Sequence, residues 1–228
     1  MIYGLSDLHL DYTKQKSMEV FGEAWENYED RMFKAWNEKV TDEDYILIPG
    51  DISWALKLEE AENDLRRIEK LPGKKILMKG NHDFWWSSLK KIENLNLKNM
   101  FFLQNNSIEI GDYVVIGTRG WISPKSCEFS EKTDRKIYDR ELLRIELSLN
   151  SIKSKDKEII CLFHYPPVEK DRTLNDFGNF AKRNNIKIVL YGHLHAGSLF
   201  NVVDEVVDGI EFHCLSADYL KFIPKIIR

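Results

Sequence analysis

The stretch Tyr45-Ile46-Leu47-Ile48-Pro49-Gly50-Asp51 contains the pattern that decides the fold. Its short apolar run, rich in β-branched residues, is typical of a buried strand. Proline and glycine then end the run, and an acidic residue follows them directly. The stretch therefore predicts a strand with a carboxylate just beyond its carboxyl end.

Four other segments repeat this arrangement of an apolar run that ends at a potentially reactive side chain. They are Ile2–Ser6 before Asp7, Lys75–Lys79 before Gly80-Asn81-His82-Asp83, Glu158–Phe163 before His164, and Ile186–Tyr191 before Gly192-His193. In open α/β sheets, ligands bind just beyond the carboxyl ends of the strands. These distant residues are therefore expected to converge on one site.

Segments with helical spacing of apolar residues lie between these strands. They are Glu23–Val40, Leu58–Leu71, Asp134–Ile152 and Thr173–Asn184, the last starting near Asn175. The alternation of strand and helix predicts an α/β fold.

Two further segments are predicted to pair antiparallel, so the sheets are expected to be mixed. One is Ser107–Ile110 with Tyr113–Gly117, and the other is Leu199–Val203 with Ile210–Leu215, joined through Asp208-Gly209. The sequence contains no internal repeat and no linker rich in proline, glycine or serine. Residues 1–228 are therefore predicted to form a single domain.

The composition excludes several classes of protein. The 228 residues carry a formal net charge of −4, which disfavours a protein that binds extended nucleic acid. The three cysteines are odd in number and form no C-x-x-C pair, which disfavours a disulfide framework. Cys161 is expected in the core. The chain shows no signal peptide and no apolar stretch that could span a bilayer, so the prediction is a cytoplasmic protein without a membrane partner.

The histidines indicate a metal centre. Five of the six lie in the polar clusters, and His213 is interpreted as an ordinary polar residue. Imidazole and carboxylate ligands without thiolates suit first-row divalent ions such as Mn, Fe, Zn, Co or Ni. Two ions about 3.5–4 Å apart need a ligand that reaches both, and Asp51 at the tip of a Gly-Asp turn can do so. A preceding glycine lets the backbone approach closely or adopt positive φ.

Five motifs, in order, resemble the calcineurin-like metallophosphoesterase superfamily. They are Asp7-Leu8-His9, Gly50-Asp51, Gly80-Asn81-His82-Asp83, His164, and Gly192-His193-Leu194-His195. The motifs run from residue 7 to residue 195 and therefore frame most of the chain. The resemblance implies two mixed β-sheets packed as a sandwich and flanked by helices.

The resemblance also implies a role for each motif residue. Asp7, His9 and His195 would bind a first metal, Asn81, His164 and His193 a second, and Asp51 would bridge them. A hydroxide bridging the two metals would attack the phosphorus in line. His82 would stabilise developing charge or protonate the leaving oxygen, and Asp83 would orient His82. Manganese is the first expectation, with Fe, Zn, Co, Ni or Mg as alternatives.

Several residues near the motifs are candidates for binding the substrate. Trp85, within Phe84-Trp85-Trp86, and Tyr165 could belong to an aromatic wall, or these tryptophans could pack under the loops. Arg119 lies in a glycine-flanked loop and could clamp a phosphate or form a structural salt bridge. The polar stretch Ile122–Lys136 could form a lid or a surface excursion.

These observations predict a metal-dependent phosphohydrolase that acts on a phosphomonoester or a small phosphodiester. Two alternatives remain open. One is a nuclease of the same superfamily, which the acidic balance of the chain disfavours. The other is a non-catalytic metal-binding scaffold, although no motif position is missing. The physiological substrate and the oligomeric state are not predicted.

Overall fold

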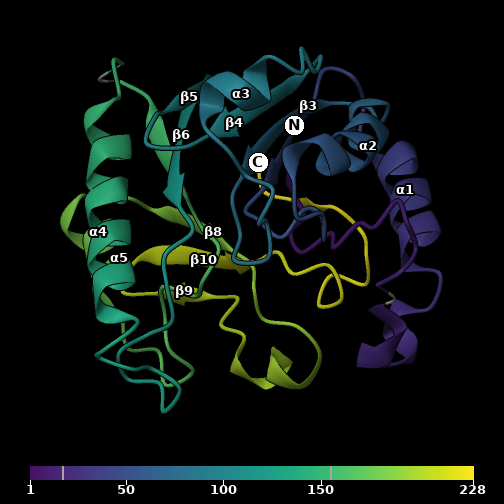
Figure 1. Ribbon diagram of the computed structural model, residues 1–228. Helices are drawn as coiled ribbons and strands as arrows, with labels where there is room; N and C mark the ends of the chain where they lie inside the picture. The colour runs from purple at the N-terminus through teal and green to yellow at the C-terminus, as the bar shows by residue number, and fades with distance from the viewer. Residues whose placement is uncertain (17, 155) are drawn as a thin grey trace.

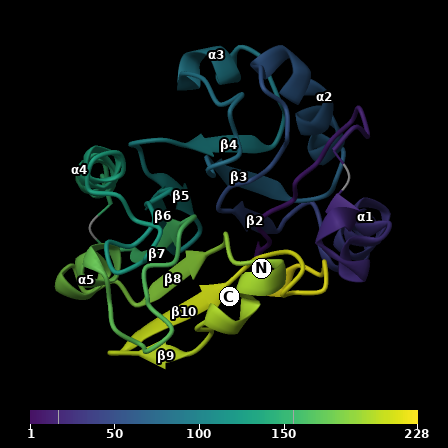
Figure 2. The same cartoon turned by 60° about the horizontal axis from the view of Figure 1, so that its bottom comes forward.

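The computed structural model describes residues 1–16, 18–154 and 156–228. Two β-sheets pack against each other and are covered by helices on their outer faces (Figures 1 and 2). The strand orders are β11-β1-β2-β3-β4 and β5-β6-β7-β8-β10-β9. The predicted sandwich of two mixed sheets is thereby confirmed.

Both sheets have a parallel centre, with one antiparallel edge strand in the first sheet and two in the second. The first contains β1 (Ile2–Gly4), β2 (Tyr45–Ile48), β3 (Lys74–Met78) and β4 (Met100–Leu103) in parallel, with β11 (Lys225–Ile226) antiparallel to β1. The second contains β6 (Tyr113–Thr118), β7 (Glu158–Phe163), β8 (Ile188–Tyr191) and β10 (Ile210–Cys214) in parallel, with β5 (Ile108–Ile110) and β9 (Val206–Val207) antiparallel at the edges. The parallel strands of each sheet therefore present their carboxyl ends at the same edge.

Helices flank each sheet. Figure 1 shows α1 (Tyr28–Lys39) and α2 (Leu58–Glu69) on one side, and α4 (Arg135–Asn150) and α5 (Asp176–Arg183) on the other. The short α3 (Leu89–Glu93) follows β3. Three 3-10 helices, η1 (Met18–Phe21), η2 (Glu23–Trp25) and η3 (Ala196–Asn201), lie in the connections. Within the described parts of the chain, no helix is long and apolar enough to cross a membrane.

The alternation of side chains along the strands produces three hydrophobic layers. In β3, Ile76 and Met78 face the space between the sheets, whereas Leu77 packs toward the layer that contains Met32 of α1 and Leu65 of α2. In β7, Ile160 and Leu162 face inward, whereas Cys161 and Phe163 join the layer under α4 and α5. These central strands are buried on both faces, which explains their continuous apolar sequences.

Most predicted elements are confirmed, with small shifts at their ends. Asn175 begins the fifth helix as expected, because its side-chain oxygen accepts hydrogen bonds from the N–H groups of Phe177 and Gly178. The helix predicted over Glu23–Val40 is interrupted. Asn27 adopts a left-handed φ of 47°, so a 3-10 turn precedes it and α1 begins at Tyr28.

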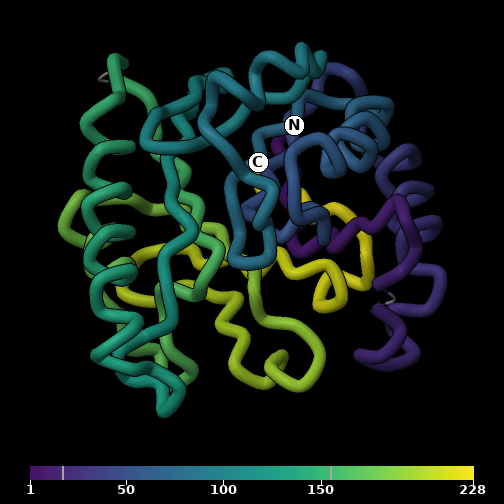
Figure 3. Tube along the Cα trace, viewed as in Figure 1, coloured from purple at the N-terminus to yellow at the C-terminus, as the bar shows by residue number. Residues whose placement is uncertain are grey.

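The second predicted antiparallel pair is partly wrong. Leu199 lies in a 3-10 helix instead of a strand, and β9 is the segment that pairs with β10. Polar and small residues in Ala196–Asn201 let that segment turn directly after the last histidine motif. The sequence interpretation also missed α3, β4 and β11. Figure 3 shows that the chain ends lie near each other, and the N–H of Ile2 donates to the carbonyl of Arg228.

Candidate metal centre

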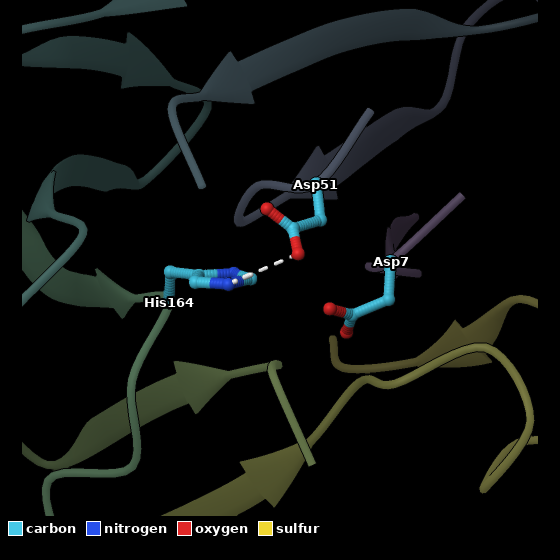
Figure 4. Close-up of side chains that lie close together, drawn as sticks. All are labelled: Asp7, Asp51 and His164. Carbon is cyan, nitrogen blue, oxygen red and sulfur yellow. Dashed lines mark ion pairs between the residues drawn. The ribbon is translucent and has the colours of Figure 1, made fainter. Parts of the chain in front are cut away.

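The predicted ligands lie in loops that follow the carboxyl ends of strands in both sheets. Asp7 follows β1, Asp51 follows β2, and His164 follows β7. Their side chains point toward one another (Figure 4), and one potential ligand atom from each lies within 4.8 Å of the others. All three residues are at most 1% exposed. The sandwich therefore brings three candidate ligands from distant parts of the chain into one buried cluster.

Asp51 lies at the centre of this cluster. Its Oδ1 accepts a hydrogen bond of 2.8 Å from the backbone N–H of His82. Its Oδ2 is 3.5 Å from Nε2 of His164 and 3.7 Å from Nε2 of His9. This buried oxygen has no hydrogen-bond partner among the described residues. Oδ2 is therefore available to a cation that two different imidazoles could also reach.

Both ring nitrogens of His164 contact oxygen atoms. Its Nδ1 is 2.9 Å from the carbonyl oxygen of Pro49, which can only accept a hydrogen bond. Nδ1 therefore carries a proton, and Nε2 faces the cluster, 2.7 Å from Oδ1 of Asn81. A hydrogen bond to the second nitrogen is the arrangement that orients metal-binding histidines in proteins.

The loops of the two sheets are also joined directly. Both carboxylate oxygens of Asp7 accept from the backbone N–H of His193, at 3.1 and 3.0 Å. Nδ1 of His193 lies 3.0 Å from Oδ1 of Asn81. Asp7 and Asn81 from the first sheet thus meet His193 from the second.

The remaining two candidates, His9 and His195, lie beside this cluster. Their ring centroids are 5.4 Å apart, and His9 stacks on Trp54 at 4.9 Å. Both ring nitrogens of His9 and Nδ1 of His195 are buried without a hydrogen-bond partner among the described residues. Buried polar atoms without partners are costly, and a bound cation would satisfy them. Oxygen and imidazole donors without thiolates fit a divalent ion.

The pKa values of the cluster also indicate that it can hold a cation. Burial disfavours the charged form of His164, but Asp51 and Asp7 outweigh burial and raise its pKa to about 9. Burial raises the pKa of Asp7 to about 6. Burial lowers the pKa of His9 to about 3. The buried carboxylates thus favour a neighbouring cation, while His9 is kept neutral and able to coordinate one.

The loops reach this geometry through unusual backbone conformations. Asp7, His9, Asp51 and His193 have φ values of 58°, 45°, 52° and 71°. Non-glycine residues rarely adopt left-handed φ, and strain of this kind gathers at functional sites. The loops also approach closely, because a Cβ on Gly80 would lie 2.1 Å from Oδ1 of Asp51. A Cβ on Gly192 would lie 2.6 Å from Oδ2 of Asp7, so both positions require glycine.

Asp83 has a different role from the one expected. Its carboxylate accepts from the backbone N–H groups of Asp51, Ile52, Ser53 and Gly80, and from the indole N–H of Trp85. With its oxygens committed to these five donors, it forms no hydrogen bond to the His82 ring in the described parts of the chain. Asp83 therefore holds the Asp51 loop against the Asn81 loop and does not orient His82 directly.

His82 lies at the partly exposed side of the cluster. Its ring centroid is 5.8 Å from that of His9 and 4.6 Å from that of Trp54. Burial lowers its pKa. His82 is thus adjacent to the candidate ligands and still reachable from solvent.

The candidate substrate residues divide into two groups. Trp85 and Trp86 are 2% and 8% exposed, and their indole N–H groups donate to Asp83 and Gln104. They pack under the loop, so the proposed aromatic wall does not include Trp85. Tyr165 instead covers His193 at a centroid distance of 4.0 Å and contacts Trp121 at 5.2 Å.

A cavity of about 380 Å³ opens beside His193. Tyr165 and Trp121 line it, together with part of the stretch predicted as a lid or surface excursion, from Ile122 to Glu128. Arg119 lies nearby, with its guanidinium 4.4 Å from the ring centre of Trp121 and its Nε 3.6 Å from Glu141. The contact between Arg119 and Glu141 agrees with the predicted structural salt bridge, but at 3.6 Å it is too long for a hydrogen bond.

Sequence reasoning missed the residues that support the candidate ligands. The carbonyl of Pro49 orients His164, and the hydroxyl of Ser198 accepts from the N–H of His195. Tyr28 donates its hydroxyl to the carbonyl of His9. Backbone acceptors have no sequence signal, and His195-x-x-Ser198 does not match the Ser/Thr-x-x-Glu/Gln capping pattern, so neither support was visible in the sequence.

Comparison with known proteins places this site in a family. The family model for calcineurin-like phosphoesterases matches residues 1–197. In an alignment 248 residues long, the chain is 25% identical to the uncharacterized protein L509 of Acanthamoeba polyphaga mimivirus, and the alignment covers 86% of this chain and 85% of the relative.

Two solved structures share the fold. A protein of unknown function from Aquifex aeolicus, AQ665, aligns with a TM-score of 0.51 and 17% identity, covering 99% of this chain and 94% of its own. TT1561 of Thermus thermophilus aligns with a TM-score of 0.55 and 17% identity, covering 85% and 81%. The family match spans all five motifs and the loops that bring their side chains together. The chain therefore belongs to the calcineurin-like phosphoesterase family.

Proposed function

We propose that this protein is a metal-dependent phosphohydrolase that acts on a phosphomonoester or a small phosphodiester. The observation that carries the proposal is the buried cluster around Asp51, where polar atoms of Asp51, His9 and His195 lack protein partners among the described residues. Family membership supports phosphoester hydrolysis as the reaction class.

The proposal assigns a pair of divalent ions to seven side chains. Asp7, His9 and His195 would hold one ion, Asn81, His164 and His193 the other, and Asp51 would contact both. When bound, such ions polarise phosphoryl oxygens and lower the pKa of water toward neutrality. Manganese is our first candidate, and Fe, Zn, Co, Ni and Mg are the alternatives.

The protein's own residues position the substrate and transfer the proton. His82 can donate a proton to the leaving oxygen, because its ring lies beside the cluster and remains partly exposed. Its backbone N–H fixes Asp51 at 2.8 Å, so the position of His82 is coupled to that of the shared carboxylate. The organic part of the substrate would occupy the cavity of about 380 Å³ beside His193, against Tyr165 and Trp121.

Steady-state hydrolysis with added Mn tests this function. Wild-type protein should hydrolyse p-nitrophenyl phosphate or its bis ester, and Asp51→Asn should lower kcat/KM at least about a thousandfold, because the carboxylate shared by both ions is lost. Asp112→Asn makes the same chemical change at an exposed hairpin residue and should match the wild type. Equal activity of Asp51→Asn and wild type would refute the assignment.

A further inference from the structure

A second cavity, of about 140 Å³, lies between the end of β3, the end of β6 and helix α4. Three cationic side chains line it, from Lys79, Arg119 and Arg144, and Glu141 is its acidic lining residue. We call it the cationic cavity. Its volume is several times the ~30 Å³ that one water occupies in the liquid, so it can hold a small polyatomic anion with water.

The single carboxylate does not neutralise the three cations. Oε1 of Glu141 lies 2.8 Å from Nη1 of Arg144 and 3.6 Å from Nε of Arg119, and Oε2 accepts from the hydroxyl of Thr118. Arg140, outside the cavity lining, also shares Oε1 at 3.4 Å. Glu141 is 1% exposed and its acceptor capacity is used. The cavity therefore retains a net positive charge.

Two of the cations keep unused hydrogen-bond donors. Nε of Arg119 is buried without a hydrogen-bond partner in the described parts of the chain. Across residues 1–16, 18–154 and 156–228, the Lys79 side chain forms no hydrogen bond or salt bridge. Lys79 is half-buried, whereas Nε of Arg119 is fully buried, and unpaired buried donors are costly. Free donors and excess positive charge together favour an anionic ligand.

The cationic cavity is attached to the metal centre through the backbone. Lys79 lies two residues before Asn81, at the end of β3. The carbonyl of Arg119 accepts from the N–H groups of His164 and Tyr165, at 3.1 and 2.8 Å. The cavity is thus fixed relative to the candidate metal centre.

We propose that the cationic cavity binds a second, non-reacting phosphate of the substrate, so that the substrates are small molecules with two phosphate groups. Guanidinium groups suit this ligand because their paired N–H donors match two phosphate oxygens. The inference rests on the proposed phosphohydrolase function and narrows its substrate class.

Matched substrates that differ by one phosphate test this inference. We suggest the bisphosphates of ethanediol, butanediol and hexanediol against their monophosphates, because the series varies the spacing between the groups. For at least one spacer, wild-type kcat/KM should favour the bisphosphate by about tenfold or more, the size expected from charge-assisted hydrogen bonds. A ratio near one for every spacer would overturn the inference.

Substitutions in the cationic cavity test whether it causes the preference for bisphosphates. Lys79→Gln and Arg144→Gln should each lower the ratio of bisphosphate to monophosphate kcat/KM toward one. Arg140→Gln is the matched control, because Arg140 contacts the same Glu141 oxygen but is 49% exposed and does not line the cavity. It should keep the wild-type ratio. An equal fall in Arg140→Gln would mean that the general positive field, and not the cavity, creates the preference.

Calorimetric titration with inorganic phosphate separates this inference from the proposed function. In the chelator-treated full chain, with its fold checked by circular dichroism, phosphate should bind, and Lys79→Gln should weaken that binding about tenfold. If neither the p-nitrophenyl esters nor any diol phosphate is hydrolysed, the proposed function fails, and this titration still tests the cavity. Absence of phosphate binding would overturn the cavity assignment. Phosphate binding without any preference in hydrolysis would assign the cavity to free phosphate and overturn its role for the substrate.

Discussion

The two ends of strands β2 and β3 differ in how their polar groups are satisfied. At the amino ends, Asp44 accepts from the N–H and hydroxyl of Thr41, both at 2.8 Å. Lys75, fully buried, donates to the carbonyl of Leu71 and to Oδ1 of Asn99. At the carboxyl ends, Oδ2 of Asp51 has no protein hydrogen-bond partner among the described residues.

This contrast separates residues that stabilise the fold from residues available for binding. Paired buried charges add stability, whereas unpaired polar atoms and left-handed backbone cost free energy that a ligand can recover. Changes at the carboxyl ends should therefore affect activity more than stability. Changes at the amino ends should affect stability more than activity.

Among the variants that test this contrast, His82→Ala at the carboxyl ends should change kcat most. It should lower kcat about a hundredfold, the low end of the range for loss of a general acid. It should leave thermal unfolding near wild type, since the ring is partly exposed. His213→Ala is the control, because the ring of His213 lies between Asp204 and Glu211, which are not among the candidate ligands. A fall in unfolding temperature without a fall in kcat would place His82 among the structural residues.

Asp44→Ala tests the amino ends and should have the opposite result. It should lower the free energy of unfolding by about 1.5 kcal/mol, the contribution expected for hydrogen bonds to a charged group, and keep kcat of the folded protein. Asp42→Ala removes an exposed carboxylate two residues away and should change little. Loss of activity in Asp44→Ala without loss of stability would break the proposed separation.

The Asp44 effect should depend on pH. Burial raises the pKa of Asp44, but the amino group of Met1 and the Thr41 donors outweigh it, so the pKa lies below its usual 3.8. A depressed folded pKa gives stability that is present above the unfolded value and is lost as pH falls through the folded value. The difference between wild type and Asp44→Ala in urea unfolding should therefore shrink below about pH 4.

Tyr165→Leu should give the smallest effect. The ring covers His193 and lines the cavity beside it, so its loss should raise KM about two- to tenfold, the range for one aromatic contact. Tyr12→Leu, at an exposed position outside this cavity, is the control. KM is measured by steady-state kinetics on the best substrate. If Tyr165→Leu leaves KM unchanged, Tyr165 does not contact the substrate.

Local patterns predicted the strands and the convergence of the motifs, whereas the sandwich of two sheets was implied by the family resemblance. Apolar runs such as Tyr45–Ile48 predict strands, and the residues after parallel strands share one edge of a sheet. The short β11 escaped prediction because its two residues pair with β1 through tertiary contact alone. Asn27 interrupted a helix that apolar spacing had predicted as continuous.

The finer features of the site depend on three-dimensional contacts. Asp83 was expected to orient His82, but the folded loops supply it with four backbone donors that no motif reveals. The cationic cavity brings together Lys79, Arg119 and Arg144 from separate parts of the chain. Only the folded structure shows that these three cations share the cavity with one carboxylate, that of Glu141.

Metal content tests the central claim most directly. Purified wild-type protein, supplemented with Mn and then desalted, should retain about two ions per chain by inductively coupled plasma mass spectrometry, as a two-ion site requires. Asp51→Asn should retain fewer than one, because the oxygen between His164 and His9 is lost. Less than one ion in the wild type, or the same content in both proteins, would contradict the assignment of Asp51 as the shared ligand of a two-metal centre.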